Sequence, residues 1–207
     1  MIALYFSLNN CNLCHDSDTL YIFLISVKFY IRYNFRTNNH GRRKKLKHLK
    51  FIDNHGSFCV NRPENTSYLY FPLASEAGLK SSVTPLLGGD SKINQDTFLL
   101  EPVSSENLHN NRFSRNFWIV KEGCSPYSVT GSSAHQEAER FTPDQEDSEL
   151  TAGLMWQTLE RTSDKLKLSS SVTSFIPVND NVEIMYVTIK NQGDVPQNLT
   201  TYGAIPI

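Results

Sequence analysis

The 207-residue sequence contains few of the motifs by which enzymes and exported proteins are usually identified. It has four irregularly spaced cysteines, and no phosphate-cradling glycine loop, nucleophile elbow or His-Glu-x-x-His motif. Its apolar run over residues 20–31 is about twelve residues long, whereas a membrane span needs ~20. Basic residues follow this run, the reverse of a signal peptide. The sequence therefore predicts a protein of the reducing cytoplasm with no membrane partner.

Charge is distributed unevenly along the chain. Residues 1–50 carry nine Lys or Arg against two acidic residues, a net charge of +7, whereas residues 51–207 carry a net charge of -8. We therefore predict a basic extension over residues 1–48, disordered or spurious, and a folded domain over residues 49–207. The basic cluster at residues 42–47 is followed by no nucleic-acid-binding module, so we predict no nucleic-acid partner.

One motif in the extension has the spacing of a cofactor site. Cys11, Cys14 and His15 match the C-x-x-C-H pattern that attaches c-type haem. A haem protein would also need export and a helical pocket, and the sequence indicates neither. Zinc would need a second cysteine pair, but Cys59 and Cys124 are isolated. We therefore predict no metal site and no cofactor.

Beyond residue 50 the pattern is typical of β-structure. The alternation of apolar and polar residues predicts strands at 57–60, 68–71, 127–129, 150–161, 168–176, 182–190 and 199–207. Breakers over residues 73–93 predict an irregular connection with one short strand, residues 134–140 predict one or two helical turns, and acidic residues 144–149 predict a solvated loop. Trp156 alternates with Leu150 and is expected to be buried.

These strands predict an all-β, mainly antiparallel fold. The last three or four, joined by short turns, form a meander at the edge of a sandwich. The final apolar strand has no closing partner in the sequence, so we expect a fold that is incomplete at the C-terminus, as in a fragment of a longer protein.

The central stretch, residues 97–118, is dense in hydrogen-bonding side chains. It contains Arg112, Arg115 and four asparagines including Asn116, and it ends in the aromatic pair Phe117 and Trp118. Guanidinium and carboxamide groups bond sugar hydroxyls, and an aromatic ring covers the apolar face of a pyranose. Alternatively, these side chains satisfy the backbone of their own loop, as Asn and Ser do in turns.

Several segments resemble one enzyme family in order and spacing. They are YLYFPLASEAG at 68–78, TP at 84–85, GD at 89–90, FLLEPV at 98–103, LHNNR at 108–112, SRNFW at 114–118 and TSFIPV at 173–178. Residues 49–207 thereby resemble the amino-terminal β-supersandwich, galactose mutarotase-like, of the cellobiose phosphorylase-like enzymes. This family is glycoside hydrolase family 94, formerly glycosyltransferase family 36.

The resemblance implies an inverting phosphorolysis of β-linked glucosides, with inorganic phosphate as co-substrate. In the family, the general acid and the phosphate-binding residues lie in an (α/α)6 barrel after the supersandwich, and no Asp or Glu of this sequence corresponds to the acid. We therefore expect an inactive fragment that contacts a β-linked oligosaccharide and the missing barrel. A homodimer with a second copy of the chain is a further candidate partner. The expected sugar contacts are Arg112, Arg115, Asn116 and Trp118.

Two further interpretations stay open. The first is a self-standing carbohydrate-binding β-sandwich, which would need an exposed aromatic platform at Trp118 or Trp156. The second is a remnant that does not fold stably without its barrel. Solubility separates them, because an exposed domain interface predicts aggregation, whereas a binding module should be soluble and monomeric.

Overall fold

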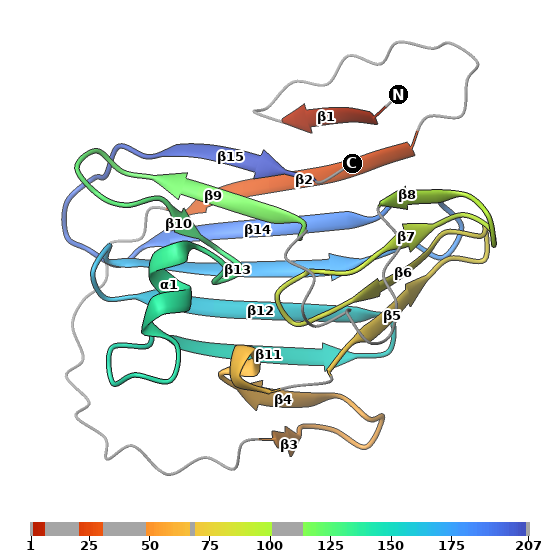
Figure 1. Ribbon diagram of the computed structural model, residues 1–207, viewed down its shortest axis with the longest axis horizontal. Coiled ribbons are helices and arrows are strands. Elements are labelled where there is room, and N and C mark those ends of the chain that lie inside the picture. Colours follow the sequence, from red (N-terminus) through yellow and green to blue (C-terminus); the bar gives the residue numbers. More distant parts are fainter. Residues whose placement is uncertain (1, 7–20, 31–48, 67–68, 101–113, 206–207) are drawn as a thin grey trace.

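A twisted eight-stranded sheet forms one complete layer of the molecule (Figure 1). The computed structural model describes residues 2–6, 21–30, 49–66, 69–100 and 114–205, the first two ranges by their backbone alone. In spatial order the sheet contains β1 (Ile2–Phe6), β2 (Tyr21–Tyr30), β14 (Ile184–Asn191), β13 (Leu168–Phe175), β12 (Trp156–Ser163), β11 (Asp147–Gly153), β4 (Phe58–Asn61) and β3 (Leu49–Phe51).

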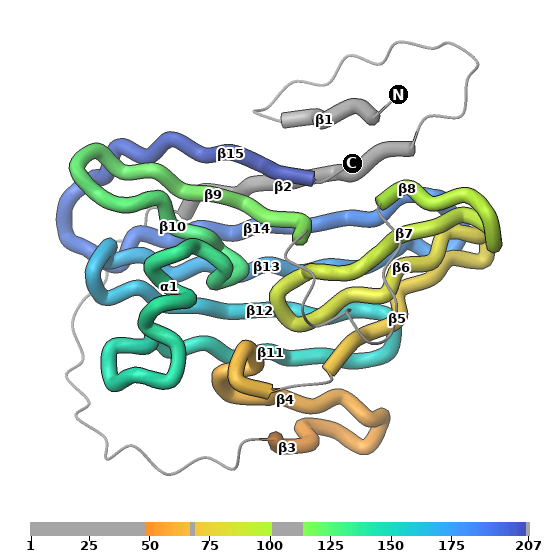
Figure 2. The backbone as a smooth tube through the Cα atoms, in the orientation of Figure 1, coloured from red at the N-terminus to blue at the C-terminus, as the bar shows by residue number. Residues whose placement is uncertain are grey.

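Two smaller sheets lie side by side on one face of this layer (Figure 2). The first has the order β10 (Tyr127–Ser128), β9 (Asn116–Val120) and β15 (Thr200–Ala204). The second contains β5 (Phe71–Ala74), β6 (Lys80–Val83), β7 (Ser91–Lys92) and β8 (Phe98–Leu100). A 3-10 turn, η1 (Pro63–Asn65), and one helix, α1 (Ala134–Glu139), complete the described elements. The predicted all-β, mainly antiparallel sandwich is confirmed.

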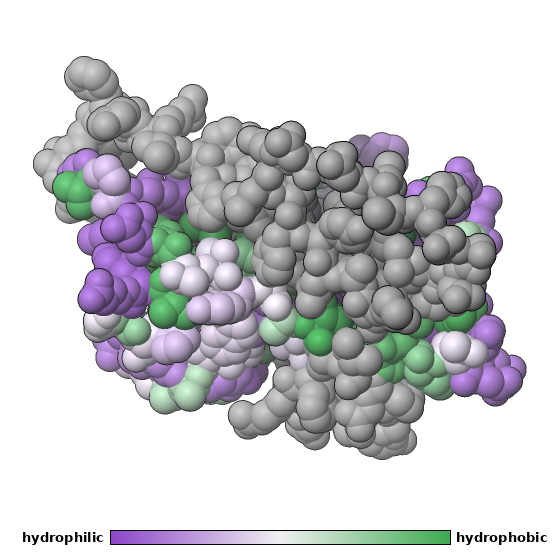
Figure 3. Space-filling model, turned by 90° about the horizontal axis from the view of Figure 1, so that it is seen from above, coloured by the Kyte–Doolittle hydropathy of each residue, from purple (hydrophilic) through white to green (hydrophobic). Residues whose placement is uncertain are grey.

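Each small sheet has its own hydrophobic core against the large one. Phe117 and Ile119 of β9 pack with Val172 of β13 and Val187 of β14. Leu73 and Val83 of the second small sheet belong to another cluster, which contains Leu150, Ala152 and Leu159 of β11 and β12. The period-2 pattern of the long strands places these residues on the inward face, where burial of apolar surface stabilises the sandwich. Seen from above (Figure 3), hydrophobic patches lie among hydrophilic ones on the described surface, and the hydrophilic residues gather mainly toward its two ends.

The predicted meander is confirmed for β11 to β14, which pair antiparallel in sequence order. The predicted strand 150–161 is wrong in one respect, because it is a hairpin of β11 and β12 with Leu154 and Met155 in the turn. Leu154 is 84% exposed and Met155 has a φ of 60°. Because of the two-residue turn, even-numbered residues point inward in β11 but odd-numbered residues point inward in β12. Gln157 and Leu159 therefore face the core. Trp156 consequently lies on the outer face, half-buried, and not in the core as expected.

Other expectations are confirmed or corrected by the remaining elements. The predicted helix over 134–140 is confirmed as α1, which begins with a capping box between Ser133 and Gln136. Residues 73–93, predicted to be mostly irregular, instead contribute to three paired strands, and Pro72 is tolerated because β5 is an edge strand. The predicted solvated loop at 144–149 is partly wrong, since β11 already begins at Asp147.

The first two strands and the last strand of the chain do not continue the antiparallel meander. The last strand, β15, pairs with β9 in the first small sheet and not with β14. Within the predicted extension, β2 pairs in parallel with β14, and β1 pairs in parallel with β2. Residues 7–20 and 31–48, which include Cys11, Cys14, His15 and the basic cluster, lie outside the described residues. The division at residue 48 stays a prediction.

Leu159 tests the second core cluster. It is 1% exposed, and the change Leu159→Ala should lower the free energy of unfolding by about 3 kcal/mol, because it leaves a cavity between two sheets. Urea denaturation followed by circular dichroism measures this loss. The matched change Glu160→Ala on the exposed face of the same strand should cost less than about 1 kcal/mol. Equal losses for the two variants would contradict the proposed orientation of β12.

Candidate functional site

The structure separates the four residues that the sequence proposes as sugar contacts. Arg112 lies outside the described residues. Arg115 is 1% exposed and Asn116 4% exposed, so both lie in the interior. Trp118 is half-buried on β9, directly opposite Tyr202 of β15, which is 55% exposed. Of the three described candidates, Trp118 has the most surface open to a ligand. Sugar binding by these residues stays a prediction.

Arg115 has several partners within the protein. Its guanidinium donates to the carbonyl oxygens of Gly89 at 3.0 Å and Asp90 at 3.1 Å, and to Glu183 Oε2 at 2.9 Å. Glu183 also accepts a hydrogen bond from the hydroxyl of Ser81. The pair is buried, so each charge depends on the other for its solvation.

Asn116 belongs to a separate network of hydroxyl groups. Its Nδ2 donates to Ser132 Oγ at 2.8 Å, and its Oδ1 accepts from Ser128 Oγ at 2.9 Å. Thr130 Oγ1 lies 3.0 Å from both serine hydroxyls. These bonds fix the turn after β10 against β9.

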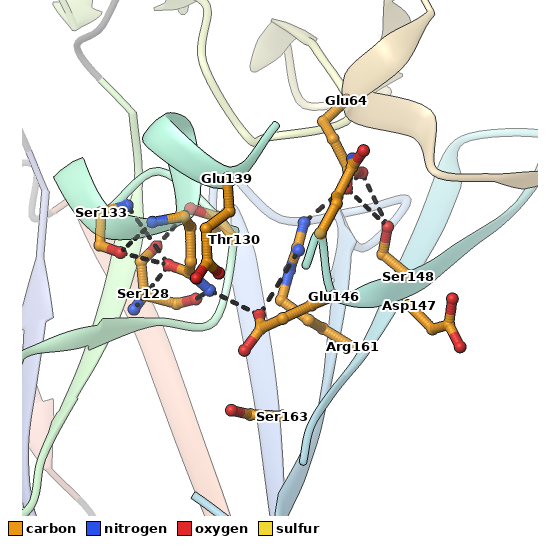
Figure 4. A network of polar contacts seen from close by, with 12 residues as sticks. Glu64, Ser128, Thr130, Ser133, Glu139, Glu146, Asp147, Ser148, Arg161 and Ser163 are labelled. Carbon is orange, nitrogen blue, oxygen red and sulfur yellow. Dashed lines mark hydrogen bonds and ion pairs between the residues drawn. The ribbon is translucent and has the colours of Figure 1, made fainter. Parts of the chain in front are cut away.

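A second buried arginine, Arg161 of β12, forms the centre of a polar cluster under α1 (Figure 4). Its Nη2 lies 3.5 Å from Glu64 of η1, and its Nη1 lies 3.8 Å from Glu146. Figure 4 shows the two carboxylates on opposite sides of the guanidinium. Gly131 has a φ of 85°, and a Cβ at this position would collide with the guanidinium. Only glycine therefore permits this close approach.

Two glutamines complete this Arg161 cluster. Gln136 of α1 donates to Glu146 Oε2 at 3.0 Å and to the Ser128 carbonyl at 3.0 Å. Gln145 donates to Glu64 Oε1 at 2.9 Å, and the hydroxyl of Ser148 donates to both oxygens of the same carboxylate. Carboxamides and carboxylates thus join η1, α1 and the loop before β11 to the large sheet.

A small cavity lies beside Arg161. It has a volume of about 10 Å³ and is lined by Glu64, Gly131, Gln136, Gln145, Glu146 and Arg161, among others. Arg161 Nε is buried and has no hydrogen-bond partner in the protein. The volume is about that required by one water molecule, so the cavity suits a buried water and is too small for a sugar.

An open groove of about 410 Å³ lies on the other side of Gln145 and Glu146, which line both spaces. Its walls come from the loop before β11 and from the turn after β12. The lining residues are Arg62, Pro143, Asp144, Gln145, Glu146, Asp147, Thr162, Asp164 and Lys165. Arg62 Nη2 lies 3.2 Å from Asp147 Oδ1 across the groove, and both side chains remain exposed, at 37% and 70%.

An exposed aromatic ring lies in the same loop. Phe141 is 72% exposed and has a φ of 66°, a conformation that a bulky residue seldom adopts. Its backbone N–H donates to Gln145 Oε1 at 3.0 Å, and the guanidinium of Arg140 lies 5.0 Å from its ring centroid. The Arg161 cluster therefore holds both the wall of the groove and this ring in place.

Sequence reasoning missed the groove and Arg161. The usable indication was an arginine at an inward position of an alternating strand, two residues after Leu159. Recognising Arg161 as an inward residue required the hairpin turn at Leu154 and Met155, which decides which residues of β12 point inward. The groove residues come from three separate segments, at residue 62, residues 143–147 and residues 162–165, and no spacing in the sequence brings them together.

No protein-family model matches the sequence, and no curated protein matches it. The likeness to the phosphorylase family therefore stays a prediction.

Among the described residues there is no helix of the length and apolarity that crossing a membrane requires, and no cluster of His, Cys, Asp and Glu arranged for a metal ion. Cys59 and Cys124 are free thiols.

The pair Arg115 and Glu183 gives a test of the interior. The change Arg115→Met should destabilise the fold by about 3–5 kcal/mol, because Glu183 is left buried and unpaired. The double variant Arg115→Met with Glu183→Gln should recover part of that loss. Chemical denaturation of the wild-type chain, the two single variants and the double variant measures the coupling energy between Arg115 and Glu183. Strictly additive losses of stability would contradict a direct interaction.

Tyr127 gives a pH test of the region around Arg161. Burial raises the pKa of its phenol above the ordinary value of 10.0, and the nearby charge of Glu146 adds to this effect. Above about pH 10 the unfolded chain releases the proton while the folded chain keeps it, so stability should fall by up to about 1.4 kcal/mol per pH unit.

The change Tyr127→Phe should remove this slope, since no phenol remains to ionise. Denaturant midpoints between pH 8 and 11 measure it, and Tyr202→Phe, on an exposed tyrosine, provides the matched control. Parallel curves for the wild-type chain and Tyr127→Phe would contradict the assigned burial.

Proposed function

We propose that residues 49–207 form a non-catalytic carbohydrate-binding sandwich of the kind that precedes the catalytic barrel in cellobiose phosphorylase-like enzymes. The observation that carries the proposal is the polar groove between Arg62, Asp147 and Lys165. Its parent reaction would be the cytoplasmic phosphorolysis of a β-linked glucoside, with inorganic phosphate as co-substrate. The chain itself would bind sugar and support the barrel.

The groove has the chemistry that a polyhydroxylated ligand requires. Its volume of about 410 Å³ falls within the range of small-molecule sites. Arg62 and Lys165 supply donors, and Asp147 and Asp164 supply acceptors, so adjacent sugar hydroxyls can donate and accept at once. The exposed ring of Phe141 lies in the same loop, two residues before the lining residue Pro143.

Rigidity of the groove wall supports the same proposal. Gln145 and Glu146 are both bonded within the Arg161 cluster, through Glu64 and Gln136. A wall that is already ordered loses little conformational entropy when a ligand binds. The groove therefore suits a ligand held by several hydrogen bonds, each modest in strength.

The proposal predicts saturable binding of a β-linked glucose disaccharide such as cellobiose. Calorimetric titration of the purified chain should detect it, and Asp147→Ala or Arg62→Ala should weaken it at least about tenfold, since each removes a polar contact of the groove. The exposed pair contributes little to folding, so both variants should remain folded.

Two comparisons accompany this titration. The variant Asp194→Ala, which removes an exposed carboxylate outside the groove, should bind cellobiose as the wild-type chain does. The variant Trp118→Ala tests the sugar contact that the sequence predicts. With phosphate added, no sugar 1-phosphate should form. Product formation would contradict the non-catalytic role, and unchanged affinity in both groove variants would exclude the groove.

A further inference from the structure

The outer face of the eight-stranded sheet carries an aromatic row that belongs to neither hydrophobic core. Trp156 of β12, Phe175 of β13 and Ile184 of β14 are direct cross-strand partners. All three are half-buried, and all three point away from the inward face that carries Gln157, Ser174 and Met185. The row spans three strands, about 10 Å at the usual spacing.

Trp156 lies close against Gly153 of β11. It pairs with Gly153 across the hairpin, and a Cβ on Gly153 would lie 2.5 Å from the indole Nε1 and 2.8 Å from Cε2. Gly153 does not have a positive φ, so its backbone does not require glycine. The close approach of the indole does.

A row of hydroxyl groups lies next to the aromatic row. Thr151, Thr158, Thr173 and Tyr186 are successive cross-strand partners one position further along the same face. Thr158 Oγ1 lies 2.8 Å from Thr173 Oγ1, so one hydroxyl donates to the other and the pair keeps acceptor and donor capacity for a ligand. Neither row contains a charged residue.

We propose that this face is a second binding site, which takes a neutral, flat polysaccharide chain of the β-1,4-glucan type. An indole with neighbouring apolar side chains can cover the apolar faces of successive sugar rings, and the hydroxyl row can bond their edges. The two rows carry no charged side chain, and the charged pair Glu149 and Glu160 lies beyond the hydroxyl row on the same face. The rows therefore favour an uncharged ligand, and their span across neighbouring strands favours an extended one. The site is separate from the groove and does not depend on it.

The test is binding to insoluble β-1,4-glucan, measured by depletion of the purified chain from solution, with granular α-glucan as the comparison. The wild-type chain should bind the β-glucan preferentially. Trp156→Ala should weaken binding at least about tenfold, because it removes the central aromatic contact. Trp156→Tyr should restore most of it. Tyr70→Ala, a change at an exposed aromatic residue outside this face, should have no effect.

A second variant keeps the test decisive if Trp156→Ala fails to fold. Thr158→Val with Thr173→Val preserves the shape of both side chains and removes the hydroxyl pair, so it should weaken binding about threefold or more. Unchanged binding in the folded variants would overturn the proposal, as would a wild-type chain that binds neither glucan. A wild-type dimer that Trp156→Ala converts to a monomer would assign the face to self-association instead, and would also overturn it.

The two proposals fail separately. Asp147→Ala should lose cellobiose binding and keep binding to the insoluble glucan, whereas Trp156→Ala should do the reverse. Loss of the first activity alone would leave the sheet face in place, and loss of the second alone would leave the groove in place.

Discussion

The buried pair of Arg115 and Glu183 connects all three sheets. Arg115 begins the segment that enters β9, and Glu183 immediately precedes β14. The guanidinium also bonds the carbonyls that precede β7, and Glu183 accepts from Ser81 of β6. A buried ion pair adds little net stability compared with apolar packing, but an unpaired member is costly. The pair therefore specifies how the two small sheets lie on the large one.

The Arg161 cluster applies the same constraint at another site. It joins η1, α1 and the start of β11 around one guanidinium, with glutamine side chains as the connecting groups. Carboxamides suit this position because each provides both donors and an acceptor. The consequence for function is indirect. The cluster itself is closed to ligands larger than water, but it shapes the open groove beside it.

The two candidate binding surfaces differ in physical character. The groove offers charged donors and acceptors at the edge of the sandwich, and so suits a small soluble sugar that several hydrogen bonds surround. The outer sheet face offers an indole beside an uncharged hydroxyl row, and so suits an extended chain that stacks on the aromatic ring. Gly153 and Gly131 have comparable roles in the two regions, because each permits the close approach of a large side chain.

The sequence alone determined the class of fold and most strands from Leu150 onward, because period-2 alternation is a local property that burial on one face imposes. It did not determine which residues of β12 point inward. Inward residues have even numbers before the two-residue turn at Leu154 and Met155 and odd numbers after it, and the alternation of apolar residues gives no sign of this change. Only the tertiary structure placed Arg115 and Arg161 in the interior and Trp156 on the outer face. It also assembled the groove from three segments, because contacts between distant residues depend on how sheets pack and not on spacing along the chain.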